Sequence, residues 1–184
     1  EYVKVIPQGF NLDNIKLAKY CKNEVPIFGY AGVFYEDIRN PKPLLEYLLK
    51  LANDGVDFTF IIYTNVVNID NMKLLKKYKS ILNSKLMIMT LIPREEVMYE
   101  LSKIDFLINI ENLSVSQTPS KLIDYTLTKR PIFSFNQLNF SEDLFMKFFQ
   151  GDYSDAIKVD LNEFDIKKIS NNFLKLTENK TYKK

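Results

Sequence analysis

Short apolar segments alternate with amphipathic segments along most of the chain. Several runs are continuously apolar rather than alternating, as is typical of strands buried on both faces of a sheet. We therefore expect strands at residues 25–30, 58–63, 86–91, 104–110 and 132–135, with a weaker sixth strand at residues 156–159.

Helical patterns lie between these runs, and most of them begin with a recognisable signal. Asn40-Pro41 predicts an N-cap followed by a first-turn proline, ahead of leucines spaced along one helix face. Pro93 is expected to open another helix, with Glu95 and Glu96 in the first turn, where carboxylates complement the helix dipole. Three further helices are expected after the N-caps Asp70, Ser141 and Asp160.

The repeated strand–helix alternation predicts an α/β fold. We expect a doubly wound, Rossmann-like parallel sheet with helices on both faces, in three layers and one domain. Residues 1–22 are expected to hold a lead-in strand and a short helix, followed by the Rossmann-like domain at residues 23–184. Ligands of such folds bind at the carboxyl ends of the strands. The informative loops are therefore 29–40, 63–70, 91–95 and 111–120.

Composition excludes several classes of protein. The chain has no histidine, which rules out a Ser-His-Asp triad or a histidine-ligated zinc site within it, and Cys21 is alone. The net charge of +2 gives no indication of nucleic-acid binding, and no apolar run approaches a membrane span. A reducing, cytoplasmic location fits these features. The chain opens at Glu1 without methionine, as expected of a piece of a longer protein.

The segment 118–125 carries the strongest chemical signal. Thr118 is a good N-cap and Pro119 suits the first helical position, so free backbone amides there favour an anion. Ser120 and Lys121 add a hydroxyl and a cation, and Asp124 adds an acceptor on the same helix face. Together these groups suit a nucleoside diphosphate. The alternative is an ordinary capped helix with a solvated lysine and aspartate.

Two other loops add weaker signals. Gly29 and Gly32 close the first strand and let a ligand approach the backbone, although their spacing is neither GxGxxG nor a P-loop. Arg39, near the next helix, can reach a diphosphate or be solvated surface. Ile92 and Pro93 can pack on a flat base, or simply begin a helix.

Read together, these loops resemble the C-terminal, nucleotide-sugar-binding domain of GT-B-type glycosyltransferases of the family 4-like group. Residues 5–11, VIPQGFN, resemble the family's V-I-P-N-G-V/F-D, and residues 28–32, FGYAG, resemble its first strand and glycine loop. Residues 93–101 and 104–106 resemble a third stretch of the family's sequence pattern. Residues 119–132, with PSKLIDY and KRPI, resemble its P-S-K-x-x-E-Y…G-K/R-P segment. The resemblance covers nearly the whole chain in the right order.

The resemblance implies a role for each loop. Asp124 would bind the ribose of the donor, and the Ile92 backbone would contact the base. Gly32 and Val33 would lie under the phosphates, and the loop with Ser116, Thr118 and Ser120 would hold the diphosphate and the sugar. With the strand–helix pattern, the resemblance predicts the strand order 3-2-1-4-5-6. It implies no metal and no cofactor, since the nucleotide sugar is the substrate.

Three positions depart from the family pattern. Many members carry glutamate at the position of Ser116 and arginine at the position of Val33, and Asp124 replaces the usual glutamate. These differences bear on the contacts with the donor sugar and on retaining stereochemistry.

A complete enzyme of this type has two similar domains, and its acceptor site lies largely in the first. We therefore expect this chain to be the donor-binding half of a hexosyltransferase-like enzyme of glycan or polysaccharide synthesis, inactive alone and with no catalytic residue of its own. Its expected partners are a nucleotide sugar and the missing N-terminal acceptor domain, and any peripheral membrane contact would come from the missing part.

Other functions stay open. Half of a sugar-nucleotide epimerase can share the fold, but it usually needs histidine in the cleft. A receiver-like signalling domain needs acidic residues after the first and third strands, where Ala31-Gly32 and Ile92-Pro93 stand. A degenerate, non-catalytic nucleotide-binding or scaffold domain of the same fold is the remaining alternative.

Overall fold

Residues 6–13, 15–35, 38–65, 69–112 and 120–178 are described by the computed structural model. The chain divides into two compact units, one of residues 16–158 and one of residues 1–15 with 159–184. The domain boundary expected between residues 22 and 23 stays a prediction.

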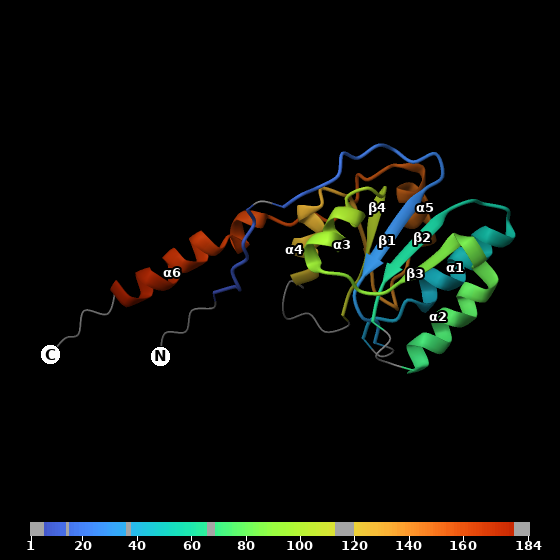
Figure 1. The fold of residues 1–184 in the computed structure, drawn as a ribbon, viewed down its shortest axis with the longest axis horizontal. Helices are drawn as coiled ribbons and strands as arrows, with labels where there is room; N and C mark the ends of the chain where they lie inside the picture. Colours follow the sequence, from blue (N-terminus) through green and yellow to red (C-terminus); the bar gives the residue numbers. More distant parts are fainter. Residues whose placement is uncertain (1–5, 14, 36–37, 66–68, 113–119, 179–184) are drawn as a thin grey trace. The chain divides into compact units, whose positions relative to one another are not determined.

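The larger unit is built on a parallel sheet (Figure 1). Its strands are β1 (Ile27–Ala31), β2 (Thr59–Tyr63), β3 (Leu86–Met89), β4 (Phe106–Ile110) and β5 (Ile132–Phe135). Their order is β3-β2-β1-β4-β5, which confirms the doubly wound α/β fold and the order of the first five expected strands.

The sixth expected strand is not formed. Residues 156–159 have no strand conformation, and only the Ile157 N–H reaches the sheet, donating to the Ile132 carbonyl at 3.2 Å. The two apolar residues between Asp155 and Lys158 are too short a run to extend a ladder.

Helices cover both faces of the sheet. Helices α1 (Lys42–Asn53), α2 (Ile69–Leu82) and α5 (Glu142–Gln150) bury leucine and aromatic side chains against one face. Helices α3 (Arg94–Leu101) and α4 (Ser120–Leu127) pack side by side on the other (Figure 1). On that face, a β-carbon placed on Gly29 would lie 2.7 Å from the Ile104 Cδ1 atom and 3.1 Å from the Leu101 Cδ2 atom, so glycine lets this layer approach β1 closely.

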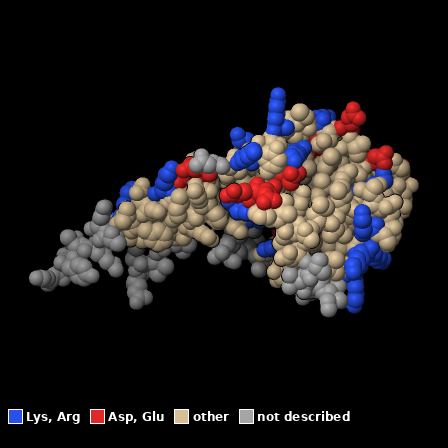
Figure 2. Space-filling view, viewed as in Figure 1, with Lys and Arg blue, Asp and Glu red and all other residues tan. Residues whose placement is uncertain are grey.

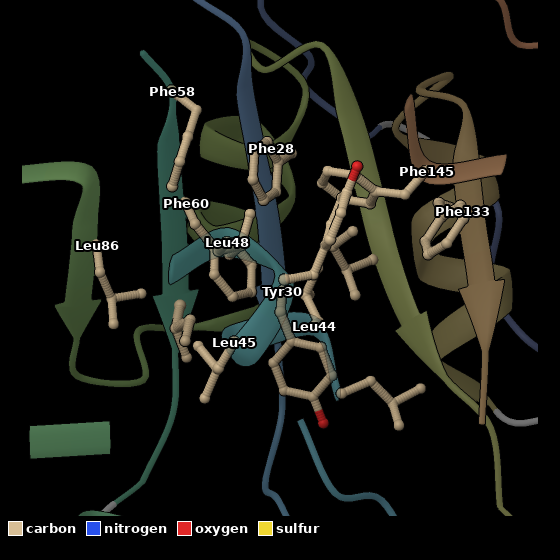
Figure 3. Packing of buried hydrophobic residues seen from close by; sticks show 14 of the residues in the cluster. Phe28, Tyr30, Leu44, Leu45, Leu48, Phe58, Phe60, Leu86, Phe133 and Phe145 are labelled. Carbon is tan, nitrogen blue, oxygen red and sulfur yellow. The ribbon is translucent and has the colours of Figure 1, made fainter. Parts of the chain in front are cut away.

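Phenylalanine dominates the core between the sheet and α5 (Figure 3). The Phe28 ring stacks between those of Phe60 and Phe106, with centroid distances of 5.1 and 5.0 Å. Phe145 of α5 meets it edge-on at 5.4 Å. Phe133 is also fully buried, so these aromatics are core and not a stacking platform.

The expected helix starts are confirmed in part. Ser141 is the N-cap of α5, and its Oγ atom accepts a hydrogen bond from the Leu144 N–H at 3.2 Å. The N-cap of α1 is Pro41 rather than the expected Asn40, whose Oδ1 atom accepts a hydrogen bond from the Lys42 N–H at 2.9 Å. Asp70, in contrast, lies inside α2.

The expected short helix before the sheet is wrong. Residues 15–22 are non-helical because side chains, not a helical turn, satisfy their polar groups. The Ala18 N–H donates to the Ser102 Oγ atom at 2.9 Å, and the Tyr20 hydroxyl donates to the Asp105 Oδ1 atom at 2.7 Å. The other Asp105 oxygen accepts the Ile27 N–H at 2.7 Å, at the head of β1.

The smaller unit joins the two ends of the chain. The Phe10 N–H donates to the Phe164 carbonyl at 2.7 Å, and the Ile166 N–H donates to the Phe10 carbonyl at 3.0 Å. Asp160 caps a 3-10 turn, η2 (Leu161–Phe164), rather than the following helix α6 (Ile166–Glu178). No helix in the described residues is long and apolar enough to cross a membrane.

Candidate functional site

The switch point of the sheet lies between β1 and β4. These strands are neighbours, while their connections run toward opposite edges of the sheet and over opposite faces. In such folds the crevice for a ligand opens at the carboxyl ends of these two strands. Arg39 and Asn112 join the segments beyond these ends, since the Arg39 Nε atom donates to the Asn112 Oδ1 atom at 2.6 Å.

The turn after β1 requires glycine. Gly32 has φ of +144°, and a β-carbon there would lie 3.2 Å from the Tyr30 hydroxyl oxygen. That hydroxyl donates to the Val33 carbonyl at 3.1 Å, and in Figure 3 it lies beyond the carboxyl ends of the strands. The hydrogen bond from the Tyr30 hydroxyl therefore holds the turn at Gly32 and Val33.

Tyr125 connects α4 to the same strand end. The Ala31 N–H donates to the Tyr125 hydroxyl at 2.7 Å, and the hydroxyl contacts the Ala31 carbonyl at 3.3 Å. Burial raises the pKa of Tyr125 well above its ordinary value, although the bond from Ala31 acts in the opposite direction. The hydroxyl thus stays protonated and holds α4 against β1.

Lys121 directs its ammonium group into the domain. Its Nζ atom is buried and, among the described residues, has no hydrogen-bond partner. It lies 3.9 Å from the centre of the Tyr30 ring and 5.3 Å from that of Tyr125. Burial lowers the pKa of Lys121 well below its ordinary value, and the positive charge of Arg39 lowers it further. A solvated lysine, the alternative left open by the sequence, is therefore wrong.

Arg39 and Lys121 together form a positive centre beside the Gly32 turn. Arg39 also acts on Tyr30, where it opposes the increase in pKa caused by burial. In the described part of the chain, neither cation has a carboxylate within salt-bridge distance. Two cations near a glycine turn, with no carboxylate partner in the described part of the chain, favour a bound anion.

Asp124 is paired with Arg94. The Asp124 Oδ1 atom accepts hydrogen bonds from the Arg94 Nε atom at 2.9 Å and from its Nη2 atom at 2.5 Å. This bond raises the pKa of the Arg94 guanidinium above its ordinary value. Arg94 is the first residue of α3, so the pair connects the loop after β3 with the first turns of α4. Sequence reasoning missed it, because partners 30 residues apart leave no local pattern.

The remaining expected site residues lie on the same loops or outside the described part. Ile92 is half-buried, and exposed Pro93 is the N-cap of α3. Ser120 is exposed and begins α4. Ser116 and Thr118 lie outside the described residues, and every assigned role in ligand binding stays a prediction.

Other features of the surface lie apart from this site. Lysines gather over α2 and carboxylates over α3 (Figure 2). Two hollows, one beside Tyr47 and Phe140 and one beside Tyr63 and Leu101, contain none of the expected site residues. Among the described residues, no group of three or more cysteine, aspartate or glutamate side chains can hold a metal ion.

Comparison with known proteins shows a shared fold. No protein-family model matches the chain, and no curated protein sequence matches it. The structure of TarM is similar with a TM-score of 0.57 at 13% identity, covering 89% of this chain and 37% of TarM. A S. aureus TarM mutant in complex with fondaparinux, alpha-GlcNAc-glycerol and UDP is similar with a TM-score of 0.54 at 13% identity, covering 96% of this chain and 38% of that chain. The chain thus has the fold of a part of TarM, and spans well under half of its length.

Proposed function

We propose that this chain is the donor-binding part of a GT-B-type glycosyltransferase, which transfers a sugar from a nucleotide-diphosphate sugar to an acceptor. The carrying observation is the positive centre of Arg39 and Lys121 beside the Gly32 turn, at the switch point of the sheet. The fold shared with TarM, one structure of which contains UDP and alpha-GlcNAc-glycerol, supports the proposal. A second domain outside this chain would bind the acceptor.

The diphosphate would lie at the positive centre. Lys121 has no hydrogen-bond partner among the described residues, so an anion near its Nζ atom would restore the interactions that burial removes. Ser120, Ser116 and Thr118 would add donors at the start of α4, and Val33 would lie below the phosphates. Negative charge develops on the diphosphate as the sugar leaves, and two fixed cations would stabilise it without a metal ion.

The nucleoside would lie along α3 and α4. Asp124 is one turn into α4, where its carboxylate can accept a hydrogen bond from a ribose hydroxyl without touching the phosphates. Ile92 and Pro93, just before Arg94, would contact the base. We assign no catalytic residue to this chain, and we expect it to transfer no sugar by itself.

A non-catalytic nucleotide-binding or scaffold domain of the same fold is the second candidate. It is favoured by Ser116 and Val33, which stand where a glycosyltransferase of the resembled family carries glutamate and arginine.

Calorimetric titration of the 184-residue chain with UDP, ADP, GDP and inorganic pyrophosphate tests the proposal. We expect binding of at least one nucleoside diphosphate. Asp124→Asn should weaken that binding about ten- to hundredfold and hardly change pyrophosphate binding, because Asp124 would contact the ribose and not the phosphates. Lys121→Ala should weaken both ligands, with a smaller effect at high salt.

A matched control is Lys76→Ala, which removes an exposed lysine from α2. Failure of the parent chain to bind any of the three nucleoside diphosphates at millimolar concentration would contradict the proposed function. Binding that Asp124→Asn leaves unchanged would show that the ribose lies elsewhere.

A further inference from the structure

The contact between Arg94 and Asp124 is one-sided. Two guanidinium nitrogens, Nε and Nη2, donate to the same carboxylate oxygen, Oδ1, at 2.9 and 2.5 Å. Among the described residues, no donor reaches the Oδ2 atom of Asp124. The carboxylate is thus held through one oxygen, while the second keeps its capacity to accept hydrogen bonds.

The backbone fixes where Arg94 begins. Pro93 is the N-cap of α3, with φ of −50° and ψ of +146°, so the chain turns from an extended loop into a helix at Arg94. Helices α3 and α4 lie side by side (Figure 1), which brings the first residue of one helix to the fifth residue of the other. The Arg94–Asp124 pair thereby connects the loop after the edge strand β3 to α4, which follows β4 on the other side of β1.

An exposed ion pair by itself has little effect on stability. The Arg94 and Asp124 side chains are 45% and 27% exposed, and solvent screening weakens the attraction in pairs of this kind. Geometry is where this pair differs from a generic surface pair. The planar guanidinium places two donors in a fixed arrangement on one oxygen, whereas a lysine ammonium is a compact point charge on a flexible stem.

We propose that Arg94 is a positioning residue, which orients Asp124 so that its free Oδ2 atom accepts the hydrogen bond of a ribose hydroxyl. Arg94 also ties this acid to the loop of Ile92 and Pro93, so that the base and the ribose meet a preformed surface. This inference rests on the proposed function, because it assigns Arg94 a role in binding the same nucleotide.

The test is a calorimetric titration of the 184-residue chain and its variants with UDP and with inorganic pyrophosphate, with ADP or GDP replacing UDP if the parent prefers either. Arg94→Gln should weaken nucleoside diphosphate binding about tenfold and leave pyrophosphate binding within about twofold. Arg94→Lys should lose less, because it keeps the charge and one donor.

A double variant separates positioning from direct contact. If Arg94 acts through Asp124, then Arg94→Gln with Asp124→Asn should bind the nucleoside diphosphate about as weakly as Asp124→Asn alone. Lys50→Gln is the matched control, since it breaks another exposed ion pair, with Glu142 at 2.9 Å, and should change neither ligand. Thermal unfolding of each variant shows that it is folded at the temperature of titration.

Each other outcome overturns the inference. Equal losses for pyrophosphate and the nucleoside diphosphate, additive losses in the double variant, or tighter nucleotide binding by Arg94→Gln would each show that Arg94 does not position Asp124. An unchanged affinity would do the same. If the parent chain binds no nucleoside diphosphate, the proposed function fails and the inference fails with it, so the parent titration distinguishes the two failures.

Discussion

The ammonium group of Lys121 lies 3.9 Å from the centre of the Tyr30 ring, in the interior of the domain. The ring face attracts the charge, but burial and Arg39 oppose it, and the net result is a pKa well below the ordinary value. The Lys121 amine, which is charged or easily charged, therefore lies buried beside the Gly32 turn without a hydrogen-bond partner among the described residues. Such an arrangement reduces stability unless something binds to it.

We expect Lys121→Met to stabilise the chain at neutral pH, because the folded chain holds the ammonium group less favourably than the unfolded chain does. The unfolded chain keeps its proton up to an ordinary pKa of 10.5, and the folded chain releases it at lower pH. The stability of the parent relative to that of Lys121→Met should therefore rise with pH between the lowered pKa and 10.5, so the advantage of the variant should shrink there. Urea unfolding at several pH values measures this. A difference in stability between the parent and Lys121→Met that does not shrink across that range would contradict the placement of Lys121.

Binding of a diphosphate should take up a proton. An anion beside the Lys121 Nζ atom raises the pKa of that group, so the complex holds a proton that part of the free protein lacks. Affinity for UDP should then fall as pH rises through the interval between the two pKa values. Calorimetry in buffers of different ionisation enthalpy detects the proton directly. Lys121→Met should remove the uptake, and uptake that persists in this variant would assign it to another group.

Gly32→Ala should destabilise the chain more than Gly55→Ala. Both glycines have positive φ, +144° and +79°, which costs about 1–3 kcal/mol for another residue. A β-carbon on Gly55 meets nothing within 4 Å, whereas one on Gly32 also crowds the Tyr30 hydroxyl at 3.2 Å. Denaturant titration of both variants compares these costs, and UDP affinity should fall only for Gly32→Ala. Equal effects of the two substitutions on stability and binding would show that the turn is not shaped by Tyr30.

Tyr125→Phe should cost about 1–3 kcal/mol, because the Ala31 N–H loses the acceptor it has at 2.7 Å. Amide hydrogen exchange at Ala31 should accelerate more than at other positions of β1. Tyr99→Phe serves as the control, since the Tyr99 hydroxyl has no hydrogen bond within the described residues. Unchanged exchange at Ala31 would mean that α4 is held to β1 by other contacts.

The sheet was predictable because its strands are encoded locally. Five of the six expected runs form strands, and Ser141 caps α5 as its position indicates, whereas Pro41 rather than Asn40 is the N-cap of α1. The non-helical segment 15–22 was not predictable, since its conformation depends on acceptors at Ser102 and Asp105, more than 80 residues away.

The candidate site shows the same division. Gly32 and the start of α4 could be located from composition and spacing alone. The inward direction of Lys121 could not, because it depends on the Tyr30 ring of a distant strand. The pairing of Asp124 with Arg94 likewise arises only when α3 and α4 pack together.

The carboxylate of Asp105 imposes an order of events on the newly made chain. Its oxygens receive the Tyr20 hydroxyl and the Ile27 N–H, groups synthesised 85 and 78 residues earlier. During translation, β1 can pair with β2 before β4 has been made. At that stage the other edge of β1 is unpaired, and the Ile27 N–H lacks its acceptor on Asp105. A nascent chain paused before Asp105 therefore displays an open, apolar strand edge to its neighbours. That edge of β1 is covered only after Asp105 and the strand that follows it, β4, have been made.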